Sequence, residues 1–335
     1  MNELNKLPHP DKIEILGQAI ALAAGAKPAK VNPWATDYHR YGDLTLSGLM
    51  GALGQPVGSF MSSSDLASTI TEAVRTLTVE ALRAPDQTHR RITRLLVTPD
   101  FKTANLPRCN PLALREVDNT GAVATLPVSL SEAELSGMRT YAGIVNFSRQ
   151  AIVNSDWDLL ASITEEMAIA GFRAEGAAVF GLLASNATLA DGTPMFDVSR
   201  GNIASVGGAP SLTTLASCIQ AMSTMAVGGV NLQLRPGILV APTGLESDLA
   251  ALFDAGADRL VPGGFITAHE LPAHVWYLLP SPEQRPVVGL AHLPRGTEPE
   301  LYTQGGFTRD GLGVRCRHTF GPVALSPYAV MNAGM

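Results

Sequence analysis

The sequence predicts an α+β fold, and three observations support this prediction. One long helical pattern runs from about Trp157 to Ser185. Several short apolar stretches with strand-like composition occupy residues 237–327. Helical and strand-like segments follow one another without the regular alternation that a parallel βαβ sheet requires. We therefore expect helical and sheet regions that are partly segregated along the chain.

The first part of the chain contains two predicted helices. Residues 11–25 place apolar side chains on one helical face. Residues 28–42 hold two prolines and a glycine, and we expect them to form an extended arm. Residues 64–84 repeat apolar side chains near helical spacing until Pro85, which ends the second helix.

A long hairpin is predicted after the second helix. Residues 90–101 and 111–128 supply two apolar, β-prone arms around Asp118–Gly121, a turn-forming sequence. The region has no further apolar face with which to build a core of its own. Such a hairpin usually packs on something else, so we expect it to lie on its own domain or on a neighbour.

The predicted helix from Trp157 to Ser185 is rich in small residues, including Gly171, Gly176 and Gly181. Ser155 and Asp158 resemble a capping box at its start. Each glycine costs a helix about 1 kcal/mol relative to alanine, so we expect close packing against this helix to be the reason for them.

The remaining elements are two loops, two helices and a series of strands. Residues 185–196 and 205–210 are expected to be loops, and residues 212–227 and 244–255 helices. Strands are expected at 237–242, 274–282, 286–293, 300–306 and 313–327, with a hairpin turn at Asp310–Gly311.

The last of these strands contains the residues that most resemble a catalytic pair. Cys316 and His318 share one parity with Val314 and Phe320, whereas Arg315, Arg317 and Thr319 lie on the other. This period of two predicts a strand with an apolar and a polar face. Same-face neighbours lie about 6.5–7 Å apart along a strand, so thiol and imidazole are not preset for a hydrogen bond. A thiol–imidazole site is the alternative interpretation.

The composition favours a protein that assembles. Charged residues form 16% of the chain, compared with about 25% in typical soluble domains. Arginine outnumbers lysine by 19 to 5, and arginine is the cation that interfaces retain. The net charge of −6 argues against a general nucleic-acid-binding surface.

Sequence signals for export, membranes and disulfides are weak. Residues 13–26 resemble a signal peptide, but Glu14 and Gln18 interrupt the apolar stretch, and the residues before it lack a net positive charge. The chain has no run of about 18 apolar residues, so no transmembrane helix is predicted. Three cysteines without CxxC spacing indicate neither a disulfide framework nor a zinc site. We therefore expect a cytoplasmic protein.

The charge changes sign along the hairpin region. Residues 83–115 carry seven basic and two acidic side chains, a net charge of +5, and residues 116–139 carry a net charge of −3. The two stretches are either simply solvated or dock onto opposite patches of adjacent copies. In the second case the candidate inter-subunit contacts are Arg90, Arg91, Arg94, Arg115, Glu116, Glu132 and Glu134.

We predict no catalytic, cofactor-binding or metal site. His269, Glu270 and His274 nearly form the HExxH zinc motif, but the spacing is one residue too long and Pro272 would break the helix. The glycine-rich stretch 262–267 lacks the context of a nucleotide loop, and Glu165–Glu166 is expected to lie on a solvated helix face.

The order of motifs resembles the major capsid proteins of tailed bacteriophages, which have the Hong Kong 97-type fold. The residues that carry the resemblance are YGDLTLSGLM at 41–50, SSSDLASTI at 62–70, DFK at 100–102, NFSRQAIVNSDWDLL at 146–160, DGTPMF at 191–196, GNIA at 201–204 and the DG…RHTFG ending at 310–321. The chain looks most like the branch in which a prohead protease precedes the capsid sequence. It contains no protease half, so the resemblance implies that scaffolding and cleavage come from elsewhere.

The resemblance also implies a division into domains. It implies an N-terminal arm at 1–62, a helix and strand at 63–96 that lead into the loop, an extended β-hairpin loop at 97–140, a peripheral domain with a long spine helix at 141–204 and 291–335, and an axial domain at 205–290.

The implied function is structural. Hexamers and pentamers of the chain would form an icosahedral shell around double-stranded DNA in the virion, assembled in the host cytoplasm. The implied partners are a portal, a scaffold, a prohead protease, an optional decoration protein and DNA bound without sequence specificity, with no membrane. Two alternatives are an encapsulin-like cargo shell and a cytoplasmic hydrolase that uses Cys316 or His318.

Overall fold

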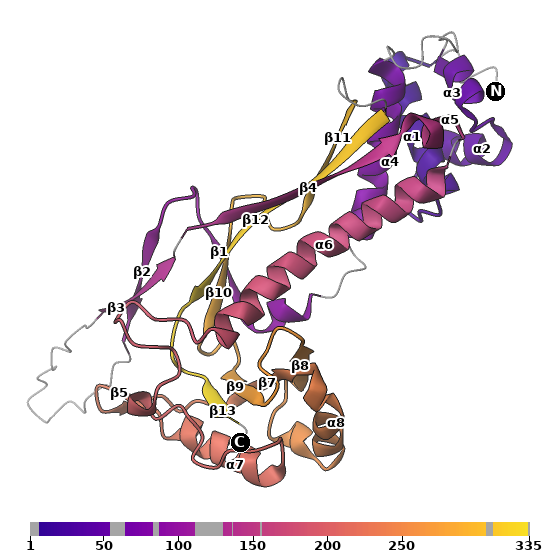
Figure 1. The fold of residues 1–335 in the computed structure, drawn as a ribbon. Coiled ribbons are helices and arrows are strands. Elements are labelled where there is room, and N and C mark those ends of the chain that lie inside the picture. The colour runs from indigo at the N-terminus through magenta and orange to yellow at the C-terminus, as the bar shows by residue number, and fades with distance from the viewer. Residues whose placement is uncertain are drawn as a thin grey trace, which may run out of the picture. The chain divides into compact units, whose positions relative to one another are not determined.

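The structure is a computed structural model, and it describes residues 7–53, 64–82, 87–110, 130–135, 137–154, 156–305 and 311–333. The chain folds into two compact units (Figure 1). Unit 1 comprises Met1–Asp86, Thr140–Ala174 and Gly296–Thr319, and unit 2 comprises Gln87–Arg139, Glu175–Arg295 and Phe320–Met335. The long helix α6 and the long strand β12 each contribute residues to both units.

Unit 1 is built mainly from helices. They are α1 (His9–Ala23), α2 (Pro33–Tyr41), α3 (Leu46–Leu53), α4 (Ser64–Ala81), α5 (Arg149–Val153) and the first part of α6 (Trp157–Ala184). The predicted helices at 11–25, 64–84 and 157–185 are thus confirmed. Leu16 and Ile20 of α1 are buried in one core with Ile70 and Val74 of α4.

The prediction of an extended arm at residues 28–42 is wrong for most of that stretch, because α2 begins at Pro33. Proline is favoured at the first position of a helix, where its missing N–H needs no partner. The side chain of Asn32 caps the helix by accepting a hydrogen bond from the backbone N–H of Trp34. The helix α3 follows and was not predicted.

The strands of unit 1 come from two distant parts of the sequence. They are β4 (Arg139–Ser148), β11 (Glu300–Gly305) and the first part of β12 (Gly311–Ala324). β11 pairs with β12 in antiparallel register from Glu300–Arg317 to Gly305–Leu312, and β4 also pairs with β12. The predicted strands at 300–306 and 313–327 are confirmed, whereas the predicted turn at Asp310–Gly311 begins outside the described residues.

β12 has the two faces that its sequence predicts. Val314, Cys316, His318 and Phe320 are buried, and Arg315 is exposed. The period of two therefore reports burial correctly along this strand.

Unit 2 contains a sheet in which β1 (Thr93–Val97) pairs in parallel with β10 (Val288–His292), and β10 pairs with the end of β12. The predicted hairpin arm at residues 90–101 is therefore wrong, because β1 pairs with a distant strand. The hairpin that the structure describes joins β2 (Ala104–Cys109) to β3 (Leu130–Leu135). The predicted turn at Asp118–Gly121 lies outside the described residues.

The base of the hairpin packs on its own chain. Ala133 and Leu135 of β3 are buried in a small core with Ala291 of β10 and Val323 of β12. The opposite parity of β3, Glu132 and Glu134, is exposed.

The rest of unit 2 is an α/β half with its own core. Its four-stranded sheet has the order β13 (Val330–Ala333), β9 (Val275–Pro280), β7 (Pro236–Pro242) and β8 (Phe265–Ala268). The helices α7 (Leu212–Ser223) and α8 (Glu246–Asp254) pack on it, and β5 (Ala226–Val227) and β6 (Val230–Asn231) form a small ribbon. Short 3-10 helices lie at η3 (Thr88–Arg91), η4 (Val198–Arg200), η5 (Thr243–Leu245) and η6 (Ala257–Arg259).

Two of the three glycines in α6 are explained by close packing. A Cβ on Gly171 would lie 2.6 Å from Cγ of Pro299, and a Cβ on Gly176 would lie 3.3 Å from Nδ1 of His89. A Cβ on Gly181 would meet no atom within 4 Å. The packing explanation therefore holds for Gly171 and Gly176 and fails for Gly181.

This difference predicts opposite effects of the same substitution. Gly181→Ala should raise the free energy of unfolding by about 0.5–1 kcal/mol, because alanine favours the helix and has room there. Gly171→Ala should lower it, because the new methyl group collides with the rigid ring of Pro299. Chemical unfolding of unassembled subunits measures both, and a stabilised Gly171→Ala variant would contradict the packing assignment.

Candidate functional site

Unit 2 contains a completely buried carboxylate. Glu175 of α6 has no exposed surface. Its Oε1 accepts a hydrogen bond from Nε of Arg90 at 2.7 Å, and its Oε2 accepts one from Nη2 of Arg90 at 3.1 Å. Nε2 of His89 lies 2.7 Å from Oε1, and Nε2 of His292 lies 4.0 Å from Oε2. The arginine therefore holds the carboxylate with both arms of its fork.

Local sequence explains how these groups meet. His89 and Arg90 are consecutive residues of the 3-10 turn η3, and both side chains contact Glu175. Gly176 follows Glu175 on α6 and leaves room for the ring of His89. Sequence reasoning considered Glu165–Glu166 on this helix and missed Glu175, although a single glutamate between Ala174 and Gly176 in a small-residue segment was an available signal.

The chemistry of this cluster is structural. Both carboxylate oxygens of Glu175 are held by groups of the same chain, and the guanidinium supplies the compensating charge. A buried carboxylate is costly unless it is paired in this way. The cluster therefore ties η3 to α6.

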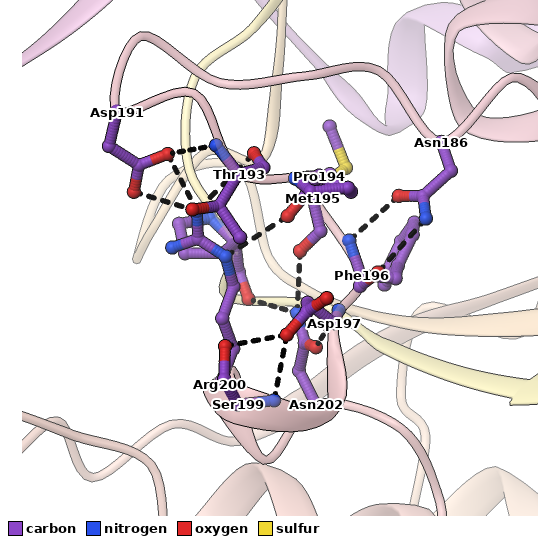
Figure 2. Close-up of polar contacts among 11 residues, drawn as sticks. Asn186, Asp191, Thr193, Pro194, Met195, Phe196, Asp197, Ser199, Arg200 and Asn202 are labelled. Atoms are coloured by element: carbon purple, nitrogen blue, oxygen red, sulfur yellow. Dashed lines mark hydrogen bonds and ion pairs between the residues drawn. The ribbon is translucent and has the colours of Figure 1, made fainter.

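A second polar cluster closes the loop between α6 and α7. Figure 2 shows Asn186 directed at Phe196, whose backbone N–H donates to Oδ1 and whose carbonyl accepts from Nδ2. Nδ2 of Asn202 donates to the carbonyl of Met195, and Oδ1 accepts from the N–H of Asp197. These residues include the DGTPMF and GNIA motifs, so the motifs encode the closed conformation of this loop.

An ion pair fastens the same loop. Nη2 of Arg200 lies 2.7 Å from Oδ2 of Asp191 (Figure 2). Partial burial would raise the pKa of Asp191, but hydrogen bonds from Arg200 and Thr193 outweigh it and hold the pKa below its ordinary value. The carboxylate therefore stays ionised and paired at neutral pH.

The candidate contact residues from the sequence have different surroundings. Arg90 is bound to Glu175, and Nη2 of Arg91 donates to the carbonyl of Gly263. Arg94 on β1 is exposed and makes no hydrogen bond or ion pair with the residues that the structure describes. Glu132 and Glu134 are exposed on β3, Glu132 accepting a hydrogen bond from Asn105. Arg115 and Glu116 lie outside the described residues.

Two strands expose apolar side chains that a soluble monomer would normally cover. On β4, Tyr141 is 41%, Ile144 64% and Val145 39% exposed. On β1, Leu95 is 50% and Val97 65% exposed. Exposed apolar strands that flank charged residues are typical of surfaces that contact other protein.

Comparison with known proteins identifies the family. Residues 137–332 match the phage capsid protein family, which is more than half of the chain. The chain belongs to the phage capsid protein family. No curated protein sequence matches it.

Solved structures share the fold, among them a phage capsid and a virus-like particle. A virus-like particle from Pyrococcus furiosus aligns with a TM-score of 0.52 at 9% identity, covering 78% of this chain and 99% of that chain. The capsid of cyanophage P-SCSP1u aligns with a TM-score of 0.50 at 11% identity, covering 75% and 89%. A Mycobacterium phage Patience structure aligns with a TM-score of 0.50 at 15% identity, covering 82% and 90%. The capsid protein thus has the expected Hong Kong 97-type α+β fold.

Its family makes the capsid protein a structural component of an icosahedral phage-like shell, located in the virion capsid, and not an enzyme. The geometry around Cys316 agrees. Burial raises the pKa of its thiol to about 11, so the nucleophilic thiolate is scarce at neutral pH. His269 and Glu270 follow β8 in a turn rather than on a helix, with His269 exposed and Glu270 half-buried.

By length and composition alone, α6 of the capsid protein could cross a membrane, with a mean hydropathy of 1.4 over its most apolar part. Half of that part is buried within the protein. Core helices of soluble proteins meet the same criteria, and a helix that carries the buried, paired Glu175 has the character of a core helix. The sequence-based expectation that the chain has no transmembrane helix stays a prediction.

The thiol environments predict slow alkylation of the folded capsid protein. Burial raises the pKa of both Cys218 and Cys316 to about 11, so at pH 8 only about one thiol in a thousand is ionised. Iodoacetamide should label these cysteines slowly in native protein and fast after unfolding, as peptide mass spectrometry would measure. Cys316→Ser should leave assembly nearly intact. Fast native labelling of Cys316, or a hydrolytic activity that this substitution abolishes, would support the enzyme alternative.

Proposed function

We propose that the capsid protein forms hexamers and pentamers that close into a shell around double-stranded DNA. The observation that carries this proposal is the exposed apolar surface of β4, which a shell subunit would bury against its neighbours. The low share of charged residues, 16%, supports it, because much of the surface would then meet other copies.

The scaffold, prohead protease and portal would be separate chains in this proposal, with an optional decoration protein on the outside. The motif order supports a relationship to the branch in which a protease precedes the capsid sequence. The net charge of −6 suits a shell wall that encloses DNA without sequence-specific binding and without adhering strongly to it.

We assign the domains as the resemblance implied, with an N-terminal arm at 1–62, a lead-in at 63–96, an extended loop at 97–140, a peripheral domain at 141–204 and 291–335, and an axial domain at 205–290. The strands β7, β8 and β9 with α7 and α8 support the axial assignment, because they share one core, which β13 of the C-terminal segment completes. Such a body can meet its copies around a symmetry axis.

The hairpin contributes an electrostatic contact between copies in this proposal. Glu132 and Glu134 form an acidic face at the hairpin base, and Arg94 is the cation of the η3–β1 stretch whose side chain lacks a described partner. Arg90 already has Glu175, and Arg91 has the carbonyl of Gly263. Arg94 is therefore the cation that we favour opposite the acidic face, with Arg115 as a second cation and Glu116 as a further acid of the contact.

The content of purified particles distinguishes this proposal from a cargo shell of the same fold. We consider the cargo shell because the aligned Pyrococcus furiosus structure is a virus-like particle. Particles produced together with the neighbouring phage genes should contain nuclease-protected double-stranded DNA. Particles that sediment as closed shells but hold a protein cargo and no DNA would favour the cargo shell. Sedimentation of monomers and dimers alone would contradict both.

The charge contact predicts that reversing the charges on both sides restores what a one-sided reversal destroys. Arg94→Glu should impair assembly and leave folding intact, because it places like charges opposite Glu132 and Glu134. Adding Glu132→Lys and Glu134→Lys should restore assembly, and Arg94→Lys is the control that keeps the charge. Light scattering during assembly at low and high salt measures the effect, which salt should weaken. Normal assembly of Arg94→Glu would show that these charges are merely solvated.

A further inference from the structure

The turn η3 joins two separate parts of unit 2. His89 and Arg90 hold the carboxylate of Glu175 on α6. The next residue, Arg91, donates from Nη2 to the carbonyl of Gly263, which precedes β8 of the four-stranded sheet. Three consecutive side chains therefore connect the helix with the α/β half.

The receiving carbonyl is held in a fixed position. The N–H of Gly263 donates to the carbonyl of Gly237 on β7 at 2.8 Å, and a Cβ at Gly263 would overlap that carbonyl. Gly264 has a φ of 72°, which favours glycine. Its N–H donates to the carbonyl of Val261 at 3.0 Å. The glycine-rich stretch is thus a rigid turn against the sheet, as expected for a stretch without the features of a nucleotide loop.

The contact on the helix side, between Arg90 and Glu175, has a defined orientation. A bidentate arginine–carboxylate pair fixes the relative orientation of its two planes, which apolar contacts do not. Replacing such a buried pair by apolar residues often leaves stability unchanged or raised. The pair between Arg90 and Glu175 therefore contributes more to geometry than to the free energy of unfolding.

We propose that η3 is a clamp that sets the angle between the C-terminal part of α6 and the four-stranded sheet of unit 2. Arg91 is the positioning residue on the sheet side, and His89 with Arg90 are the positioning residues on the helix side. This angle determines the direction in which the α/β half meets its copies, and hence the curvature of the shell. The last step rests on the proposed axial role of residues 205–290.

Arg91→Met tests the clamp without threatening the fold, because Arg91 is exposed. The variant should assemble into particles of several sizes or unclosed sheets, where the wild type yields one size class by electron microscopy. Arg91→Lys should restore the single size class, because lysine can also donate to the carbonyl of Gly263. Arg259→Met, which removes another exposed arginine of unit 2, is the matched control and should assemble as the wild type does.

Hydrogen exchange on unassembled subunits tests the clamp independently of assembly. Amides of residues 261–268 should exchange faster in Arg91→Met than in the wild type, with unit 1 unchanged. Arg90→Lys, which loses the fork and keeps the charge, should speed exchange in η3. Unchanged exchange at 261–268 would overturn the clamp even if the wild type formed no shells. Faster exchange with shells of wild-type size would keep the clamp and reject its role in curvature.

Discussion

One buried negative charge constrains much of unit 2. Glu175 lies on α6 with no exposed surface, so the fold must bring compensating groups to it. Arg90 and His89 supply these groups from η3, and β1 begins at Thr93, two residues after the end of η3. β1 then pairs in parallel with β10, whose last residue, His292, also lies near the carboxylate. The side chain of Glu175 thus connects α6 with η3, which precedes β1, and lies near the last residue of β10.

The surface of the capsid protein makes sense when it is considered as part of a shell. β4 extends over ten residues and buries only Phe147. In a protein that remained monomeric, the apolar side chains of this strand would stay in contact with water. Burial of apolar strands in contacts between copies would recover the hydrophobic free energy that the isolated chain forgoes. The same argument accounts for the small number of charged residues, since a side chain in an interface need not be solvated.

The loop between α6 and α7 shows how short polar motifs can encode a closed loop conformation. Asn186, Asp191 and Arg200 bind backbone and side-chain groups a few residues away, so their geometry depends on the local sequence. Asn202 extends this network to the carbonyl of Pro327 near the end of the chain. Most of this network is local, so a short stretch of sequence is enough to specify it.

Features with a local cause could be predicted from the sequence alone. The helix at 157–185, the buried face of β12 and the tight approach at Gly171 follow from periodicity and residue size, which act over one or two turns or along one strand. The order of motifs also indicated the capsid fold and a structural role. Tertiary structure decided the features that depend on distant partners. It showed β1 paired with β10 instead of with a hairpin arm, Arg90 committed to Glu175 instead of to the surface, and Pro33 starting a helix instead of breaking one. Strand pairing and burial of charge are set by residues far apart in the chain, and no local pattern records which of them will meet.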